Sequence, residues 1–235
     1  MKSSTLHKIE GKIFDGKYDW QSVDKILAWK NEHVLELVRE ACLVESYFAV
    51  YTGKMLDLFW YDVEATSMYT IEAFEAYTHY YLLRRYLDAV EFKPISDEEV
   101  VALRKKDDGK IYDDEIRELV NFMGTEHFAT VFFSDLSLLA EEPVLKKILL
   151  DMSKQEIAHK EFALDLLRAR LCARPELSKC ILKSAKEFLH VGGYVLPRVS
   201  NAREDMVRII AGFDECIKKL VGESVSSYSA SNKLQ

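Results

Sequence analysis

Two side chains near residue 157 have the types and the spacing of a metal-chelating pair. Glu156 and His159 are three residues apart inside an apolar-periodic stretch. On a helix of ~3.6 residues per turn, this spacing places both side chains on one face. A carboxylate and an imidazole held in this way can bind one metal ion. Such pairs also arise by chance on solvated helix faces, so the pair gains meaning only if the rest of the chain supplies matching ligands.

Matching ligands occur in three other helical stretches. Each stretch carries one carboxylate among apolar residues, and one adds a histidine: Glu45, then Glu75 with His79, then Glu126. Glu45 and Glu75 are 30 residues apart, as are Glu126 and Glu156. In two helical hairpins, these equal separations would bring the carboxylates of each pair to a similar height. A carboxylate on an apolar stripe is costly to bury unless a cation compensates its charge.

The second stretch offers a choice between two carboxylates. Glu75 precedes His79 by four residues and Glu72 precedes it by seven. Both spacings project a side chain near that of His79 on a helix. We prefer Glu75 because of the matched 30-residue separation, and because a one-residue π-bulge before His79 would bring the pair to the geometry of Glu156 and His159. Glu72 is the alternative.

Four carboxylates and two imidazoles suit a pair of divalent ions. Two such ions carry a charge of about +4, which four carboxylates neutralise, and the imidazoles leave positions open for dioxygen. The sequence therefore predicts an all-α protein whose four-helix bundle encloses a di-metal carboxylate core. The alternative is a plain helical bundle with a few buried ion pairs.

Long helices are needed to position these residues. Glycine and proline are scarce, nine and four in 235 residues, and apolar residues recur at three and four over 31–58, 62–90, 113–140 and 143–173. We expect a polar arm or a short packing segment at 1–20, shorter helices at 21–30, 97–105, 176–189 and 202–221, and a loop at 190–197. One domain should span 1–222, with the metal-binding bundle at about 31–173 and a disordered serine-rich tail at 223–235.

The charge balance and the apolar runs restrict the partners. The formal net charge is -7, which disfavours nucleic acid because phosphate binding requires a basic face. No apolar run approaches the ~18 residues of a membrane helix, and the N-terminus lacks the apolar segment of a secretion signal. The four cysteines have no zinc-type spacing. We therefore expect a soluble cytoplasmic protein with free thiols and no membrane span.

Three runs in the helical core carry a family resemblance. They are His79-Tyr80-Tyr81-Leu82-Leu83-Arg84-Arg85-Tyr86-Leu87, Thr125-Glu126-His127-Phe128-Ala129-Thr130 and Glu156-Ile157-Ala158-His159. With the helices around them, residues 41–173, they resemble the ferritin-like di-iron carboxylate superfamily and, within it, the soluble acyl-acyl-carrier-protein desaturases. The resemblance covers a little over half of the chain. It implies a ferritin-like four-helix bundle with accessory N- and C-terminal helices.

Two positions depart from the family pattern. Ala76 stands three residues before His79, where the family has a glutamate. Gln155 stands where the desaturases have an acidic residue that supports the opposite histidine. The chain is also short for a plant-type desaturase. These differences concern the substrate and the reaction more than the metal site.

The resemblance implies an oxygen-dependent di-iron oxidoreductase that acts on an unactivated C–H bond. The expected ligands are Glu45, Glu75 (or Glu72), His79, Glu126, Glu156 and His159. Glu126 and one further carboxylate would bridge two iron ions, for which manganese or a mixed pair could substitute. O2 and external electrons would be co-substrates, with a protein such as a ferredoxin as donor. Thr130 resembles the family's active-site threonine and is the candidate catalytic residue; otherwise its hydroxyl would bond its own helix backbone.

The resemblance also suggests a substrate and partners. A fatty acyl chain on an acyl-carrier protein is the expected substrate, and this acidic carrier would dock on a basic rim. The rim residues are Arg168, Arg170, Arg174, Lys179 and Lys183. The same centre could instead hydroxylate or N-oxygenate a small molecule. A hypothesis from a different functional class is that the protein stores iron or handles peroxide. The rubrerythrin form of this class is disfavoured because paired cysteines are absent. We expect a homodimer.

Overall fold

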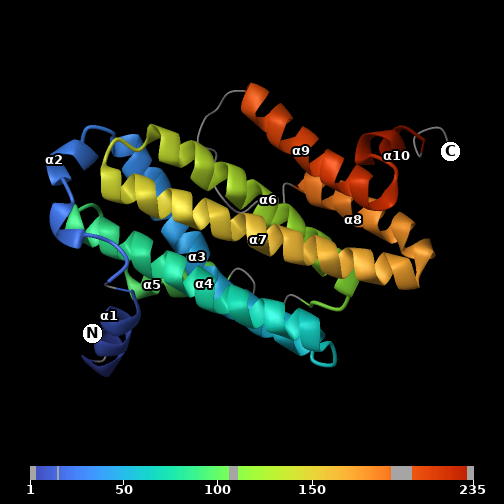
Figure 1. The fold of residues 1–235 in the computed structure, drawn as a ribbon, viewed down its shortest axis with the longest axis horizontal. Helices are drawn as coiled ribbons and strands as arrows, with labels where there is room; N and C mark the ends of the chain where they lie inside the picture. Colours follow the sequence, from blue (N-terminus) through green and yellow to red (C-terminus); the bar gives the residue numbers. More distant parts are fainter. Residues whose placement is uncertain (1–3, 15, 106–110, 192–202, 232–235) are drawn as a thin grey trace.

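Four long helices form the centre of the molecule. The computed structural model describes residues 4–14, 16–105, 111–191 and 203–231, and these residues contain helices and no strands. The long helices are α3 (Glu32–Leu58), α4 (Val63–Ala89), α6 (Glu115–Leu139) and α7 (Pro143–Ala173). Their positions confirm the four long helices predicted from periodicity, to within two residues at each end. α3 pairs with α4 and α6 pairs with α7, so that two hairpins run along the long axis of a helical bundle (Figure 1).

A side chain caps the start of each long helix. The capping residues of α3, α4, α6 and α7 are Asn31, Asp62, Asp114 and Glu142, each accepting a hydrogen bond from the backbone N–H three residues later. Such bonds satisfy donors that the helix itself leaves unpaired. Pro143 follows its cap at the first helical position, where the missing N–H costs nothing. The caps thus fix where each helix starts and therefore the height of each polar residue within the bundle.

Shorter helices cover the two ends. They are α1 (Ser4–Phe14), α2 (Lys25–Ala28), α5 (Asp97–Lys105), α8 (Ser178–Val191), α9 (Arg203–Val221) and α10 (Val225–Ser231), with 3-10 turns at Trp20–Ser22 and Pro175–Leu177. α8 and α9 pack on α6, and α10 packs on both, whereas α1 lies toward the opposite end (Figure 1). None of the described helices has an apolar stretch long enough to cross a membrane.

The two chain ends compare differently with expectation. Residues 1–20 contain α1, whose Phe14 is buried, in agreement with the short packing segment expected there. The expected disordered tail contains α10, whose first residue, Val225, is also buried. Asp214 in α9 accepts hydrogen bonds from the Val225 backbone N–H and from the Ser226 hydroxyl. This anchoring comes from another helix, which the serine content of the tail could not reveal. The expected loop after residue 191 and the last four residues lie outside the described residues.

The buried apolar residues form two clusters, one toward each end of the bundle. In α3, Cys42 belongs to the first cluster and Phe48 to the second. In α7, Met152 belongs to the first and Ala163 to the second. A layer of buried carboxylates and imidazoles lies where the two clusters meet. In α3 and α7 its residues lie between these positions, whereas Glu72 in α4 and Glu126 in α6 have residues of the second cluster on both sides. The apolar packing therefore holds the polar layer from both sides and separates it from water.

Candidate metal centre

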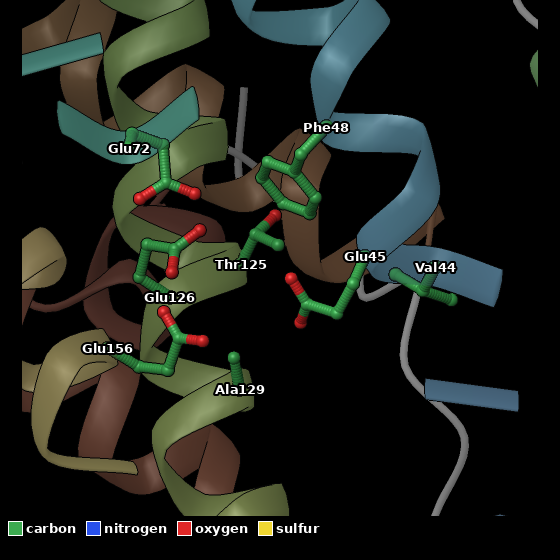
Figure 2. A pocket seen from close by; sticks show the side chains of 8 residues that line it. All are labelled: Val44, Glu45, Phe48, Glu72, Thr125, Glu126, Ala129 and Glu156. Atoms are coloured by element: carbon green, nitrogen blue, oxygen red, sulfur yellow. The ribbon is translucent and has the colours of Figure 1, made fainter. Parts of the chain in front are cut away.

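The polar layer contains six buried side chains that can ligate metal. Their exposed fractions are 5% or less, and they come from four helices: Glu45 from α3, Glu72 and His79 from α4, Glu126 from α6, Glu156 and His159 from α7. They form two groups, Glu45–His79–Glu156 and Glu72–Glu126–His159. Within each group the ligand atoms all lie within 4.8 Å of one another. Figure 2 shows the four carboxylates converging from the surrounding helices.

Both histidines turn the same ring nitrogen toward the carboxylates. Nδ1 of His79 lies 3.2 Å from Oε1 of Glu156 and 3.5 Å from Oε2 of Glu45. Nδ1 of His159 lies 2.7 Å from Oε2 of Glu72 and 2.8 Å from Oε2 of Glu156. The Nε2 atoms point away from the four carboxylates of the layer and make hydrogen bonds to Gln155 and Glu75. This common orientation leaves Nδ1 as the nitrogen that can ligate metal in each group.

Glu156 lies between the two groups. Its Oε1 faces His79 and its Oε2 faces His159. Glu126 contacts only His159 among the two histidines, with 3.6 Å between Nδ1 and the nearer carboxylate oxygen. The expectation that Glu126 bridges two ions together with one further carboxylate stays a prediction. Glu156 is the carboxylate placed to bridge two ions.

The structure groups Glu72, and not Glu75, with Glu126 and His159. Glu72, Ala76 and His79 are spaced by four and three residues and are all at most 3% exposed, so they form the inward stripe of α4. The Glu75 side chain lies on the flank of this stripe and is 26% exposed. Its Oε2 instead meets Nε2 of His159 at 2.6 Å. α4 is a regular α-helix through this region, without the π-bulge that a Glu75 ligand was expected to need.

Burial makes the carboxylates hard to ionise without a cation. Desolvation raises the pKa of Glu45 to about 7, although His79 opposes the shift. Desolvation also raises the pKa of Glu72, against the effect of His159. The pKa of Glu126 is raised well above its usual range by desolvation and by the neighbouring carboxylates. These shifts show that the layer carries more negative charge than its surroundings stabilise.

The residues at the middle of the layer show the opposite behaviour. Burial would raise the pKa of Glu156, but His79 and His159 on either side hold it below its usual range. Burial would lower the pKa of both imidazoles, but Glu156 and Glu45 raise that of His79 well above its ordinary value. Glu72, followed by Glu126 and Glu156, raises that of His159 in the same way. The layer therefore favours positive charge at both Nδ1 positions.

A pair of metal ions fits this arrangement. Three buried atoms of the layer have no hydrogen-bond partner: Oε2 of Glu72, Nδ1 of His79 and Oε1 of Glu126. Oε2 of Glu72 is close to Nδ1 of His159, but that nitrogen is already bonded to Glu156. Buried polar atoms are normally paired, and each orphan of this kind requires an explanation. Buried oxygen and nitrogen atoms that converge without hydrogen-bond partners are typical of metal ligands.

A small cavity adjoins the layer on the α3 and α6 side. Its volume is about 10 Å³, enough for about one water-sized molecule. Besides the four carboxylates, its lining residues are Val44, Phe48, Thr125 and Ala129. Sequence reasoning did not select these four residues. Each lies one residue before or three residues after a ligand on α3 or α6, which is the signal that could have identified them.

Thr130, the expected catalytic residue, does not line this cavity. Its hydroxyl donates a hydrogen bond to the backbone carbonyl of Glu126 at 2.8 Å. The structure therefore shows the alternative considered for Thr130, a hydroxyl bonded to the backbone of its own helix. Thr125 lines the cavity beside the carboxylates (Figure 2), and its hydroxyl donates to the backbone carbonyl of Asn121. Thr125 is therefore the residue of the cavity lining that carries a hydroxyl.

Two further groups lie away from the centre. His127 directs Nε2 to the backbone carbonyl of Ile209 in α9 at 2.9 Å, so it joins α6 to α9. Several residues of the expected basic rim are paired with acids. Arg170 contacts Asp62 at 2.6 Å, and the other pairs are Arg168 with Asp165 and Lys183 with Glu187. The rim is therefore a mixed surface rather than a continuous positive one.

Comparisons of the chain with protein-family models, with curated proteins and with solved structures give no match. The functional argument therefore depends on the geometry of the site and on the residues that form it.

Proposed function

We propose that this protein is an oxygen-dependent oxidoreductase with a di-iron carboxylate centre, acting on an unactivated C–H bond. The observation that carries the proposal is the pair of buried groups, each with two carboxylates and one imidazole nitrogen, in the middle of the bundle. This donor set suits iron or manganese, and its placement on four facing helices is that of di-metal carboxylate bundles. A ferritin-like fold is part of the proposal.

A bound pair of iron ions supplies O2 reduction with external electrons and the oxidising power to break a C–H bond. The contribution of the chain is to hold and enclose this centre. The four carboxylates offset the charge of two divalent ions, and the Nε2 hydrogen bonds of His79 and His159 fix both rings with Nδ1 inward. Val44, Phe48 and Ala129 enclose the remaining cavity and limit the access of water.

A fatty acyl chain on an acyl-carrier protein remains our proposed substrate, supported by the sequence resemblance. The cavity of about 10 Å³ is too small for such a chain, so acyl binding would require Phe48 or Val44 to move. The basic residues of the rim would have to break their ion pairs within this chain before they could pair with acidic residues of the carrier protein. Hydroxylation or N-oxygenation of a small molecule places the same demands on the centre and is the alternative reaction. A ferredoxin-type donor and a homodimer are also proposals.

The size of the cavity favours a second candidate, an iron-storage or peroxide-handling protein. Space for about one water-sized molecule is sufficient for O2 or peroxide, and no organic substrate needs to enter. In that case the same six side chains would hold ferrous iron while O2 or peroxide oxidises it. They would then release the oxidised iron rather than retain it for substrate oxidation.

Anaerobic loading with ferrous iron tests the centre that both candidates share. We expect about two iron ions per chain, and less than about one for Glu156→Ala, which removes the carboxylate between the groups. Glu161→Ala on the same helix is the matched control, because the Glu161 side chain is 51% exposed and points away from the layer. Stoichiometric iron binding that is unchanged in Glu156→Ala would refute the di-metal centre.

Oxygen consumption separates the two candidates. The reduced, iron-loaded protein is mixed with O2 in the presence and absence of acyl-carrier substrates, and in a second experiment with excess ferrous iron. Faster O2 consumption and a modified acyl chain support the oxidoreductase. Retention of many iron ions per chain, without any effect of acyl substrates, supports storage instead.

A further inference from the structure

The two histidines of the candidate centre differ in what supports them. Nε2 of His159 bonds Oε2 of Glu75 at 2.6 Å, and Nε2 of His79 bonds Oε1 of Gln155 at 3.0 Å. The support is crossed between helices, since Glu75 on α4 supports a histidine of α7 and Gln155 on α7 supports a histidine of α4. One acceptor is therefore a carboxylate, and the other is a neutral amide.

Gln155 and Glu75 also hydrogen-bond each other, and this contact fixes the hydrogen positions. The amide oxygen of Gln155 faces His79, so its NH2 group is the part that can donate to the Glu75 carboxylate. With this orientation, Nε2 of His79 must carry the hydrogen that it donates to Gln155. Nε2 of His159 likewise donates to Glu75, so Nδ1 is the atom of each ring that faces the carboxylate layer and that would ligate an ion. A continuous chain therefore joins the two imidazoles on the outer side of the centre.

The two acceptors do not act equally on their imidazoles. A hydrogen bond from an N–H to a carboxylate is shorter and about twice as strong as one to a neutral acceptor, and the distances of 2.6 and 3.0 Å follow this order. A carboxylate acceptor also makes the far ring nitrogen more basic and a better metal ligand. If Glu156 bridges the two ions, the direct ligands also favour the position of His159, which then has one carboxylate more than the position of His79. Replacing Glu75 separates its own contribution from that of the direct ligands.

We propose that Glu75 and Gln155 make the two metal positions unequal, so that the position ligated by His159 binds a divalent ion more tightly than the position ligated by His79. Glu75 and Gln155 are positioning residues in this proposal, because they act on the ions only through the imidazoles. The inference rests on the proposed di-metal function and specifies an order of loading for it. The His159 position fills first, and the His79 position is the one that loses or exchanges its ion.

Titration of the full-length chain with Co²⁺ under anaerobic conditions tests the proposal. Stepwise constants are measured by competition with a chelator, and crystals with less than one Co²⁺ per chain are examined by anomalous scattering to locate the ion. We expect two constants that differ about 10- to 100-fold, with the first ion beside His159. Glu75→Gln should weaken the tighter constant about tenfold and bring the two together. Gln155→Glu should strengthen the weaker constant.

Glu64→Gln is the matched control, because Glu64 is an exposed carboxylate on the same helix as Glu75. Two ions bound with equal affinity in the wild type would overturn the inference and leave the di-metal function standing. Equal weakening of both constants by Glu75→Gln, with loss of thermal stability, would show a purely structural role and also overturn it. Failure of the wild type to bind Co²⁺ at all would overturn both the inference and the proposed function. If Glu75→Gln folds poorly, Gln155→Glu still decides the test, because the proposal predicts that this variant binds the second ion more tightly.

Discussion

Replacing Gly124 by alanine should destabilise the protein because of one close contact. Gly124 is buried in α6, two residues before Glu126. A Cβ atom at this position would lie 2.6 Å from Cε1 and 2.7 Å from Cζ of Phe188 in α8. The Phe188 ring cannot move away easily, because it packs on Phe128 and Phe213 with ring centroids 5.9 and 5.2 Å apart. The added methyl group therefore overpacks the contact between α6 and α8.

Gly53 provides the control for this substitution. It lies in the last two turns of α3, and a Cβ atom added there would have no neighbour within 4 Å. In both helices, alanine gains about 1 kcal/mol of helix propensity over glycine. Only Gly124→Ala adds an overpacking cost, of about 1–3 kcal/mol. We expect Gly53→Ala to stabilise by up to about 1 kcal/mol and Gly124→Ala to lie about 1–3 kcal/mol below it.

Urea denaturation of the metal-free protein measures this difference. The midpoints should separate at an unchanged m-value, since neither change alters the surface exposed on unfolding. Phe188→Leu combined with Gly124→Ala should recover part of the loss, because the smaller side chain makes room for the methyl group. Equal stabilisation by the two alanine variants would refute the reasoning, because it would mean that Phe188 moves at no cost.

Three further predictions concern the candidate centre and His127, which joins α6 to α9. Glu72→Gln should reduce the iron bound from about two ions per chain to about one, whereas Glu75→Gln should keep two that are bound less tightly, as measured by metal analysis. Thr125→Val should change the rate of O2 consumption more than Thr130→Val does, because only Thr125 lines the cavity. Burial holds the pKa of His127 below its usual range, so below pH ~6.5 the unfolded chain takes up a proton that the folded chain resists. Stability should therefore fall as the pH drops from 7.5 to 5, and less so in His127→Gln, when urea midpoints are compared.

The long helices could be predicted from sequence because their signals are local. Apolar residues at three and four, a capping side chain and the position of Pro143 all act within one helical turn. The short helices at the ends depend on contacts between elements. α10 begins where Asp214 of another helix accepts its N-terminal hydrogen bonds, and no pattern inside a serine-rich segment predicts that partner.

The candidate ligand set could be predicted except at one position. The preference for Glu75 assumed that each hairpin places its two carboxylates at equal height. Glu126 and Glu156 are each 13 residues from the ends of α6 and α7 at their turn. Glu45 is also 13 residues from the end of α3, but Glu72 is only nine residues from the start of α4. Glu45 is grouped with His79 on α4, not with a carboxylate, and Glu72 joins the other group. Equal spacing in sequence was therefore a coincidence, and the buried stripe of α4 was the better signal.

Each candidate ligand group takes side chains from both hairpins. Glu45 and His79 from the first hairpin meet Glu156 from the second, and Glu72 from the first meets Glu126 and His159 from the second. Neither hairpin alone holds a complete group, so an ion could be fully ligated only after the two hairpins have docked. Metal uptake would then be the last event of assembly. The bound ions would act as a reversible cross-link between segments distant in sequence. They would thus help to offset the entropy that the chain loses when the two hairpins are held together, a cost that the apolar contacts offset alone in the metal-free protein.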